Sequence, residues 1–229
     1  FGLKFGLVGS LTERLQRDPS VREIIPLGGG RFRADFIDAL GQRPDVAFAI
    51  ARTRQIAATA ELLLPAKGRA VTVEMLPTAA GDPLLQQVPP PQALHQVVQS
   101  FTAAENLGPA AGDDLQASFS RQQAGKVQWR QTRLQVAAVL PLAAFERDGL
   151  FASLALLEAV EDYRDGRGVP ALGWPGEAAG NDAQRIYPAF RLYARGLADV
   201  EKLRAYFAER KWLVSTQAAQ IAQVQALGR

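Results

Sequence analysis

Two strand-helix-strand segments stand far apart in the sequence of 229 residues, and they constrain the fold more than any other feature. In residues 20–54, the strand VREIIP precedes the helical pattern RADFIDALGQR and the alternating strand PDVAFAIAR. In residues 190–216, the strand FRLYAR precedes the helical pattern LADVEKLRAYFAER, which Asp199 is placed to cap, and the strand WLVST. Neither segment can bury both faces of a sheet alone, so we expect the two to lie side by side in one sheet.

The residues between these segments begin with a hairpin and a cluster of prolines. The extended stretches Ile56–Leu64 and Ala70–Leu76 flank the turn sequence PAKGR, and we expect this hairpin to widen the sheet of the end segments. The prolines that follow are Pro77, Pro83, Pro89, Pro90 and Pro91. Because proline suits neither a helix interior nor a central strand, this span predicts a subdomain boundary.

The predicted fold class is therefore α+β, with a split subdomain and an insertion. Residues 1–78 and 186–229 form the discontinuous subdomain of two strand-helix-strand units. Residues 79–185 form an inserted β-rich subdomain, whose short strands and helices predict a small mixed sheet.

The two ends of the chain carry apolar residues at helical spacing, in residues 3–15 and 217–227. We expect the first helix to pack on a dimer mate or on residues 217–227, the alternative being a helix on a membrane surface. The sequence begins at Phe1 without methionine, which indicates a piece of a longer protein. Adjacent ends suit a domain inserted between two membrane helices, and they suit any other domain insertion equally well.

Charge and cysteine content exclude several classes of function. The net charge is +3, and the basic residues are scattered among acidic ones, so the composition does not indicate a nucleic-acid surface. Cysteine is absent, which excludes disulfides and thiolate metal sites but leaves the cellular compartment open.

Turn and packing motifs of the middle region resemble those of a known family. The sequences HQVVQSFTAAENLGPAAGDDLQASFSR and RLQVAAVLP, followed by GLFASLALLEAV, are similar to the extracytoplasmic core of the FtsX/MacB/LolC type of ABC-transporter permease. The shared features are a strand at Val97-Val98, a short helix ending at Gly108, the pair Gly112-Asp113, and a strand over Val136–Pro141. The stretches RPDVAFAIARTR and FRLYARGLADVEKLRAYF also look like a branch of this family, and the resemblance covers nearly the whole chain.

The resemblance implies a fold, a mode of action and a location. The split subdomain would be porter-like and the insertion Sabre-like. The parent would be a permease of the bacterial inner membrane with four membrane helices per subunit, working as a dimer with a separate ATPase subunit that binds ATP. This chain would be its periplasmic domain, with no cofactor of its own, and it would couple ATP-driven motion to a periplasmic protein or lipoprotein partner. Lipoprotein handling, export and envelope signalling are the roles found in the family. A self-contained sensor domain that binds a small ligand is the alternative.

The residues that could support catalysis do not form a catalytic site in the sequence. His95 is the only histidine, no Gly-x-Ser-x-Gly motif is present, and we expect His95 to be a surface or strand residue. Gly28–Gly30 lies between a strand and a helix but lacks a complete phosphate-binding motif, so it predicts a tight turn. We therefore expect no enzyme activity.

Acidic pairs occur at Asp113-Asp114 and at Glu161-Asp162. Neighbouring carboxylates point in different directions, and neither pair has the spacing of a calcium loop. We expect them in solvated turns and on helix faces, and we expect no metal site.

Arg52 and Arg54 lie two residues apart, on one face of a predicted strand. We expect one of two roles for them: they bind an anionic ligand, or they form ion pairs with Glu61 or Glu74 on neighbouring strands.

The loop GRGVPALGWPGEAAGNDAQ places large apolar residues in a glycine-rich setting. Leu172, Trp174 and Pro175 are therefore the candidate partner-binding residues, because an exposed indole is a natural anchor for a partner protein. The alternative is that Trp174 folds back to cover the small subdomain.

Overall fold

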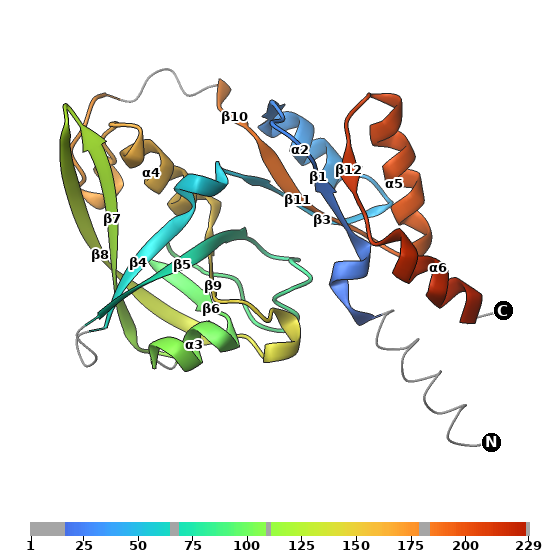
Figure 1. Ribbon diagram of the computed structural model, residues 1–229, viewed down its shortest axis with the longest axis horizontal. Helices are drawn as coiled ribbons and strands as arrows, with labels where there is room; N and C mark the ends of the chain where they lie inside the picture. Colours follow the sequence, from blue (N-terminus) through green and yellow to red (C-terminus); the bar gives the residue numbers. More distant parts are fainter. Residues whose placement is uncertain (1–16, 65–68, 109–110, 179–183, 228–229) are drawn as a thin grey trace. The chain divides into compact units, whose positions relative to one another are not determined.

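The structure is a computed structural model, and it describes residues 17–64, 69–108, 111–178 and 184–227 (Figure 1). The chain divides into two compact units. The split unit comprises Phe1–Ile50 and Ala189–Arg229, and the inserted unit comprises Ala51–Pro188. Both helices and sheets are present, as the predicted α+β class requires.

The split unit is built on a four-stranded sheet in the order β12-β1-β11-β3. Its strands and helices are β1 (Glu23–Pro26), β2 (Phe32–Arg33), α2 (Ala34–Gly41), β3 (Val46–Arg52), β11 (Ala189–Ala194), α5 (Leu197–Glu209) and β12 (Val214–Ser215). Strand β1 runs antiparallel to both β11 and β12. The prediction that the two distant segments share one sheet is confirmed, but they interleave, because β11 lies between β1 and β3. Two interleaved β-α-β units are the arrangement of ferredoxin-like folds.

Helix α5 packs on this sheet through the side chains that the sequence pattern assigned to its inner face. Val200, Leu203 and Phe207 are at most 3% exposed, and each such burial contributes about 1.5 to 3 kcal/mol. Asp199 takes part in the cap of α5, as the sequence predicted, although it is not the N-cap residue itself. Gly196 is the N-cap residue, and Asp199, three residues into the helix, accepts a hydrogen bond from the Gly196 N–H at 3.1 Å.

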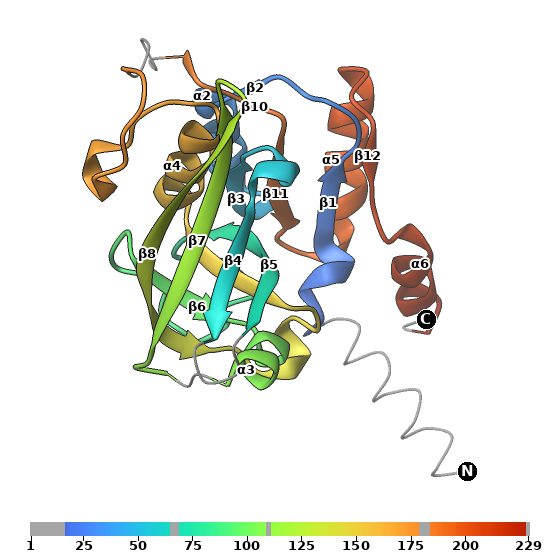
Figure 2. The same cartoon turned by 60° about the vertical axis from the view of Figure 1, so that its left-hand side comes forward.

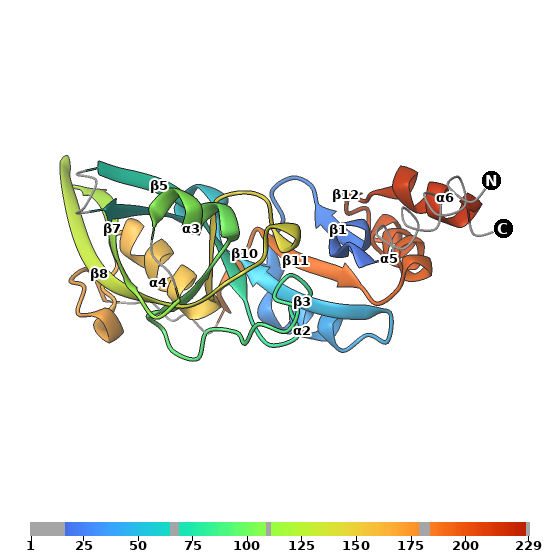
Figure 3. The same cartoon turned by 90° about the horizontal axis from the view of Figure 1, so that it is seen from below.

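The two ends of the described chain meet in the split unit. The short 3-10 helix η1 (Pro19–Arg22) packs against α6 (Ala218–Leu227), and Ile221 of α6 is buried. Figure 3 shows α6 following β12 near the end of the described chain. The helix expected at residues 3–15 lies outside the described residues.

The inserted unit is a closed barrel with the strand order β4-β5-β9-β6-β8-β7 (Figure 2). Its strands are β4 (Thr59–Leu64), β5 (Arg69–Thr78), β6 (Gln96–Gln99), β7 (Asp114–Gln123), β8 (Lys126–Val139) and β9 (Gly149–Ser153). Its helices are α3 (Phe101–Leu107), α4 (Leu154–Arg164) and the 3-10 turns η2 (Gln55–Ala57), η3 (Leu142–Ala144) and η4 (Pro170–Leu172), and β10 (Ile186–Tyr187) ends the unit. Pairing of β4 with β7 closes the barrel.

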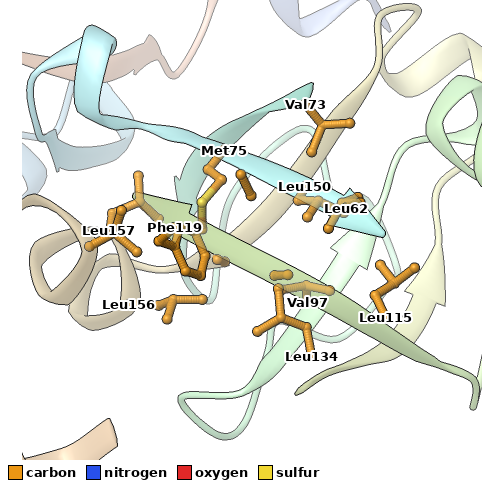
Figure 4. Close-up of a cluster of buried hydrophobic side chains, with 14 of the residues drawn as sticks. Leu62, Val73, Met75, Val97, Leu115, Phe119, Leu134, Leu150, Leu156 and Leu157 are labelled. Carbon is orange, nitrogen blue, oxygen red and sulfur yellow. The ribbon is translucent and has the colours of Figure 1, made fainter. Parts of the chain in front are cut away.

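Alternate residues of the strands fill the barrel, as Figure 4 shows. Leu62, Met75, Phe119 and Leu134 are fully buried, and Leu156 of α4 joins the same cluster. Inward and outward residues alternate along a strand, so one apolar residue in two suffices to fill the interior. The barrel therefore has a packed core.

The division of the chain differs from the predicted boundary after residue 78. Strands β4 and β5 form the predicted antiparallel hairpin, but β4 pairs with β7 and β5 pairs with β9, so both belong to the inserted unit, which begins at Ala51. The small mixed sheet expected there is therefore a closed barrel. The proline-rich stretch also lies within this unit. Its Asp82 accepts hydrogen bonds from the Thr78 hydroxyl and the Leu84 N–H, which fixes the turn after β5.

Candidate functional site

The predicted anchor Trp174 is buried. Its side chain is 4% exposed, and its ring lies against those of Phe119 and Tyr163, with centroid distances of 5.5 and 5.2 Å. The indole therefore completes the core of the inserted unit, which is the alternative that the sequence left open. An exposed anchor at Trp174 is excluded in this structure.

The backbone around Trp174 explains why the indole turns inward. Val169 and Trp174 exchange two backbone hydrogen bonds of 2.9 and 3.1 Å, and Gly173 between them has φ +69°. Leu172 packs partly buried against the same core, whereas Pro175 is exposed. The three predicted partner-binding residues thus do not form one exposed apolar surface.

Arg52 and Arg54 pair with carboxylates of the inserted unit. Arg52 lies 3.6 Å from Glu74, one of the two predicted partners. Arg54 lies just beyond β3 and contacts Asp165 at 2.6 Å and Glu161 at 3.3 Å, so the predicted partner Glu61 is wrong for it. The hydrogen bond to Asp165 is the main reason that the pKa of Arg54 is raised.

Glu161 is buried, contrary to the prediction of a solvated carboxylate, whereas Asp162 beside it on α4 is partly exposed. Arg185 donates to Glu161 Oε1 at 2.7 Å and to Asp162 Oδ1 at 3.0 Å, and Glu161 is 8% exposed. Burial lowers the pKa of Arg185, but the carboxylates of Asp162, Glu158 and Glu161 outweigh it and raise the pKa overall. The neighbouring Tyr187 donates its hydroxyl to Glu158 at 2.6 Å, and its pKa is raised by burial first and by this hydrogen bond second. These contacts hold Arg185 and β10 on α4.

The remaining sequence candidates lie on the surface. His95 is exposed just before β6, and Asp114 is an exposed residue that lies 3.6 Å from Arg133. Gly28 takes φ +80° in the turn after β1, as a tight turn requires. No group of three or more potential metal-binding side chains occurs in the ranges that the structure describes.

A pocket of about 410 Å³ opens in the inserted unit beside the part of β7 that lies beyond its pairing with β4. Residues of η2, β7, the start of β8 and the end of α4 line it, including Arg54, Ile56, Arg121, Val127, Arg164 and Asp165. Three arginines and a single aspartate line the pocket, and Asp165 already pairs with Arg54. The pocket therefore carries excess positive charge.

Arg121 is the most buried charged residue of this pocket. Residues 115, 117, 119 and 121 of β7 face inward, so Arg121 continues the apolar row and is 6% exposed. Its Nε donates to Gln128 Oε1 at 2.7 Å, and one terminal nitrogen reaches the carbonyls of Tyr163 and Arg167 at only 3.5 and 3.4 Å. The guanidinium lies 4.2 Å from the centre of the Tyr163 ring.

Arg164 bridges the diverging strands. It donates to the carbonyl oxygens of Ala57, Ser120 and Thr59 at 3.1, 3.0 and 2.7 Å, where β4 and β7 no longer pair with each other. Burial lowers the pKa of Arg164, and the charge of Glu61 opposes this effect. Within the described ranges neither Arg121 nor Arg164 has a carboxylate at ion-pair distance.

Sequence reasoning did not single out Arg121 and Arg164. One signal was available, because Arg121 stands at an inward position of an otherwise apolar alternating strand. The position of Arg164 depends on α4 packing at the end of a barrel, which the sequence did not predict.

No helix in the described ranges has both the length and the apolar content needed to cross a bilayer. No known family model matches this chain, and no curated protein sequence is similar to it.

Proposed function

We propose that this chain is the extracytoplasmic domain of an inner-membrane ABC-transporter permease that transmits force. In this proposal the domain is not an enzyme. The split unit moves with membrane segments at its two ends, and the inserted unit carries that motion to a periplasmic protein or lipoprotein. ATP is bound by a separate ATPase subunit, and a second permease subunit completes the assembly.

The observation that carries the proposal is the interleaving of the two distant segments in one sheet. Strand β1 near one end of the described chain pairs with both β11 and β12 near the other. A displacement applied at both ends would therefore act on one hydrogen-bonded body. The contact between η1 and α6 supports the same interpretation, because it brings entry and exit together.

The finer fold assignment belongs to this proposal. The split unit, with its interleaved β-α-β order, would be the porter-like subdomain. The closed barrel would be the Sabre-like subdomain, and its packed core supports a role as a stiff element that transmits displacement.

Membrane topology tests the proposal directly. The gene should encode one apolar segment of about 18 or more residues before Phe1 and about three after Arg229. A phosphatase reporter that is active only outside the cytoplasm, inserted at the exposed Ala124-Gly125 turn, should be active in the full-length protein. The same insertion in a version whose preceding apolar segment is deleted is the control, and it should be inactive. Soluble flanking domains, or an inactive reporter in the intact protein, would contradict the proposal.

A specific observation also favours the second candidate function, a domain that binds a small ligand. The pocket of about 410 Å³ falls within the size range of small-molecule sites, which is about 300 to 1,000 Å³. It also contains two guanidinium groups that lack a carboxylate partner in the described ranges. Ligand binding in the inserted unit is compatible with a transmitting role for the split unit.

A further inference from the structure

The arginine-lined pocket of the inserted unit has the features of an oxyanion site. Arg121 is 6% exposed, yet its cation has one short hydrogen bond, to Gln128, and two long contacts with carbonyl groups. Buried cations in proteins are normally paired or fully hydrogen-bonded, so this one lacks the expected compensation. The ring of Tyr163 adds a cation–π contact, but it supplies no negative charge and no hydrogen-bond acceptor for the guanidinium nitrogens.

The second cation of the pocket points to the same class of ligand. All hydrogen bonds of Arg164 go to neutral oxygen atoms, on Ala57, Thr59 and Ser120. Its positive charge therefore has no neutralising hydrogen-bond acceptor. Guanidinium groups bind carboxylate and phosphate in a bidentate manner, which makes an oxyanion the fitting ligand for this pair.

The rim of the pocket supplies apolar surface next to these cations. Ile56 is 87% exposed and Val127 is 54% exposed, and both line the pocket. A ligand that carried a hydrocarbon part beside its anionic group would cover these side chains.

We propose that this pocket binds an amphiphilic oxyanion, which is a carboxylate or phosphate group attached to a short hydrocarbon part. The anionic group contacts Arg121 and Arg164, and the hydrocarbon part lies on Ile56 and Val127. This inference rests on the second candidate function and names its ligand class, and it is independent of the membrane topology in the first.

Calorimetric titration with octyl phosphate below its micellar concentration tests the proposal. We expect octyl phosphate to bind at least tenfold more tightly than inorganic phosphate and than neutral octanol. Equal binding of octanol and octyl phosphate would overturn the oxyanion assignment while leaving a ligand-binding pocket. If none of the three probes binds, both the oxyanion assignment and the ligand-binding function of the pocket are overturned. That result would not bear on the membrane topology that the phosphatase reporter tests.

A pair of variants at the exposed rim isolates the charge without disturbing the core. Val127→Asp and Val127→Asn both remove the apolar contact of Val127, but only Val127→Asp places a carboxylate at the pocket, so it should bind octyl phosphate at least tenfold more weakly than Val127→Asn does. Arg121→Lys keeps the positive charge but removes the planar guanidinium group, so it should weaken octyl phosphate binding. The melting temperature of this variant is measured in parallel to check that it is folded. Arg133→Gln removes a charge from a side chain that is 70% exposed and outside the pocket, so it should bind like the wild type. Equal affinities of Val127→Asp and Val127→Asn for octyl phosphate would overturn the proposal.

Sedimentation with phosphatidylglycerol vesicles distinguishes two possible ligands of this class, the phosphate group of a membrane lipid and a free amphiphile in solution. Co-sedimentation that Val127→Asp abolishes identifies a lipid phosphate as the ligand. Octyl phosphate binding without co-sedimentation identifies a free amphiphile, and both results support the pocket. Co-sedimentation that is unaffected by Val127→Asp, without octyl phosphate binding, would contradict it.

Discussion

The ring of Trp174 packs against the ring of Tyr163 with their centroids 5.2 Å apart, and this contact anchors a glycine-rich loop on α4. Truncation of Trp174 to alanine removes one of the largest side chains of the core. We expect Trp174→Ala to lower the free energy of unfolding by about 3 to 5 kcal/mol, because it leaves a cavity. Urea denaturation followed by circular dichroism measures this change.

Trp129 provides the matched control for that experiment. It belongs to the same barrel, but its side chain is 49% exposed. Trp129→Ala should change the free energy of unfolding by no more than about 0.5 kcal/mol. A similar loss for both tryptophans, or a loss below about 1 kcal/mol for Trp174→Ala, would show that the indole does not contribute to the core as described.

The local elements could be predicted from the sequence because hydrophobic period and turn residues determine them. Gly108 ends α3 with φ +90°, as the sequence predicted. Sharing of one sheet by the two end segments was also predictable, since neither could bury its faces alone. The interleaved strand order was not predictable. The hydrophobic pattern indicates which face of a strand is buried, but it does not indicate which other strand lies next to it in the sheet.

The barrel escaped prediction for the same physical reason. The hairpin of β4 and β5 has an apolar face that suits either neighbouring sheet, and only pairing of Leu62 with Ala117 across strands distant in sequence decides between them. The burial of Trp174 likewise depends on Phe119 and Tyr163, which lie 55 and 11 residues earlier in the chain. The prediction of solvated carboxylates at Glu161 failed because Arg185 comes from a separate segment.

Replacement of Arg185 by methionine should destabilise the inserted unit through the charge that it leaves behind. Glu161 and Arg185 have side chains that are only 11% and 14% exposed. Loss of one partner of a buried ion pair lowers the free energy of unfolding by about 3 to 5 kcal/mol. Because Arg54 remains near Glu161 in the variant, we expect Arg185→Met to lower the free energy of unfolding by about 3 kcal/mol or less. Denaturation in urea measures the loss.

The surface pair of Arg133 and Asp114 is the control for Arg185. Its side chains are 70% and 47% exposed, so Arg133→Gln should leave the stability nearly unchanged. If Arg185→Met were as stable as this control, the contacts of Arg185 with Glu161 and Asp162 would not stabilise the attachment of β10 to α4.

Acid sensitivity of the split unit should depend in part on Asp45. Arg43 donates two hydrogen bonds to this carboxylate, at 3.0 and 2.9 Å, and the hydrogen bonding from Arg43 is the main reason that the pKa of Asp45 is lowered. A carboxylate whose pKa is lower in the folded state than in the unfolded state stabilises the folded protein at pH values above its unfolded-state pKa. This stabilisation is lost as the pH falls through the folded-state pKa. Between about pH 5 and pH 2, the stability of Asp45→Asn should therefore fall less steeply than that of the wild type.

Asp38 serves as the control for the pH series, since it is an exposed carboxylate of α2. Asp38→Asn removes one exposed carboxylate from the same unit, and the stability of Asp45→Asn is compared with that of this variant at each pH. Parallel curves for Asp45→Asn and the wild type would contradict the assigned role of the Arg43 pair.

A methyl group at Gly176 should displace the loop that carries Trp174. A Cβ atom there would lie 2.3 Å from the Arg167 carbonyl carbon and 2.4 Å from the Gly168 nitrogen, and these backbone atoms cannot move aside as a flexible side chain would. We expect Gly176→Ala to lower the free energy of unfolding by about 1 to 3 kcal/mol and to increase the solvent exposure of the Trp174 indole, measured by fluorescence quenching with acrylamide.

Gly29→Ala is the matched control, because its Cβ would have no neighbour within 4 Å, and it should change neither stability nor quenching. Equal quenching of Gly176→Ala and Gly29→Ala would show that the close approach of Gly176 to Arg167 and Gly168 does not hold the indole in the core.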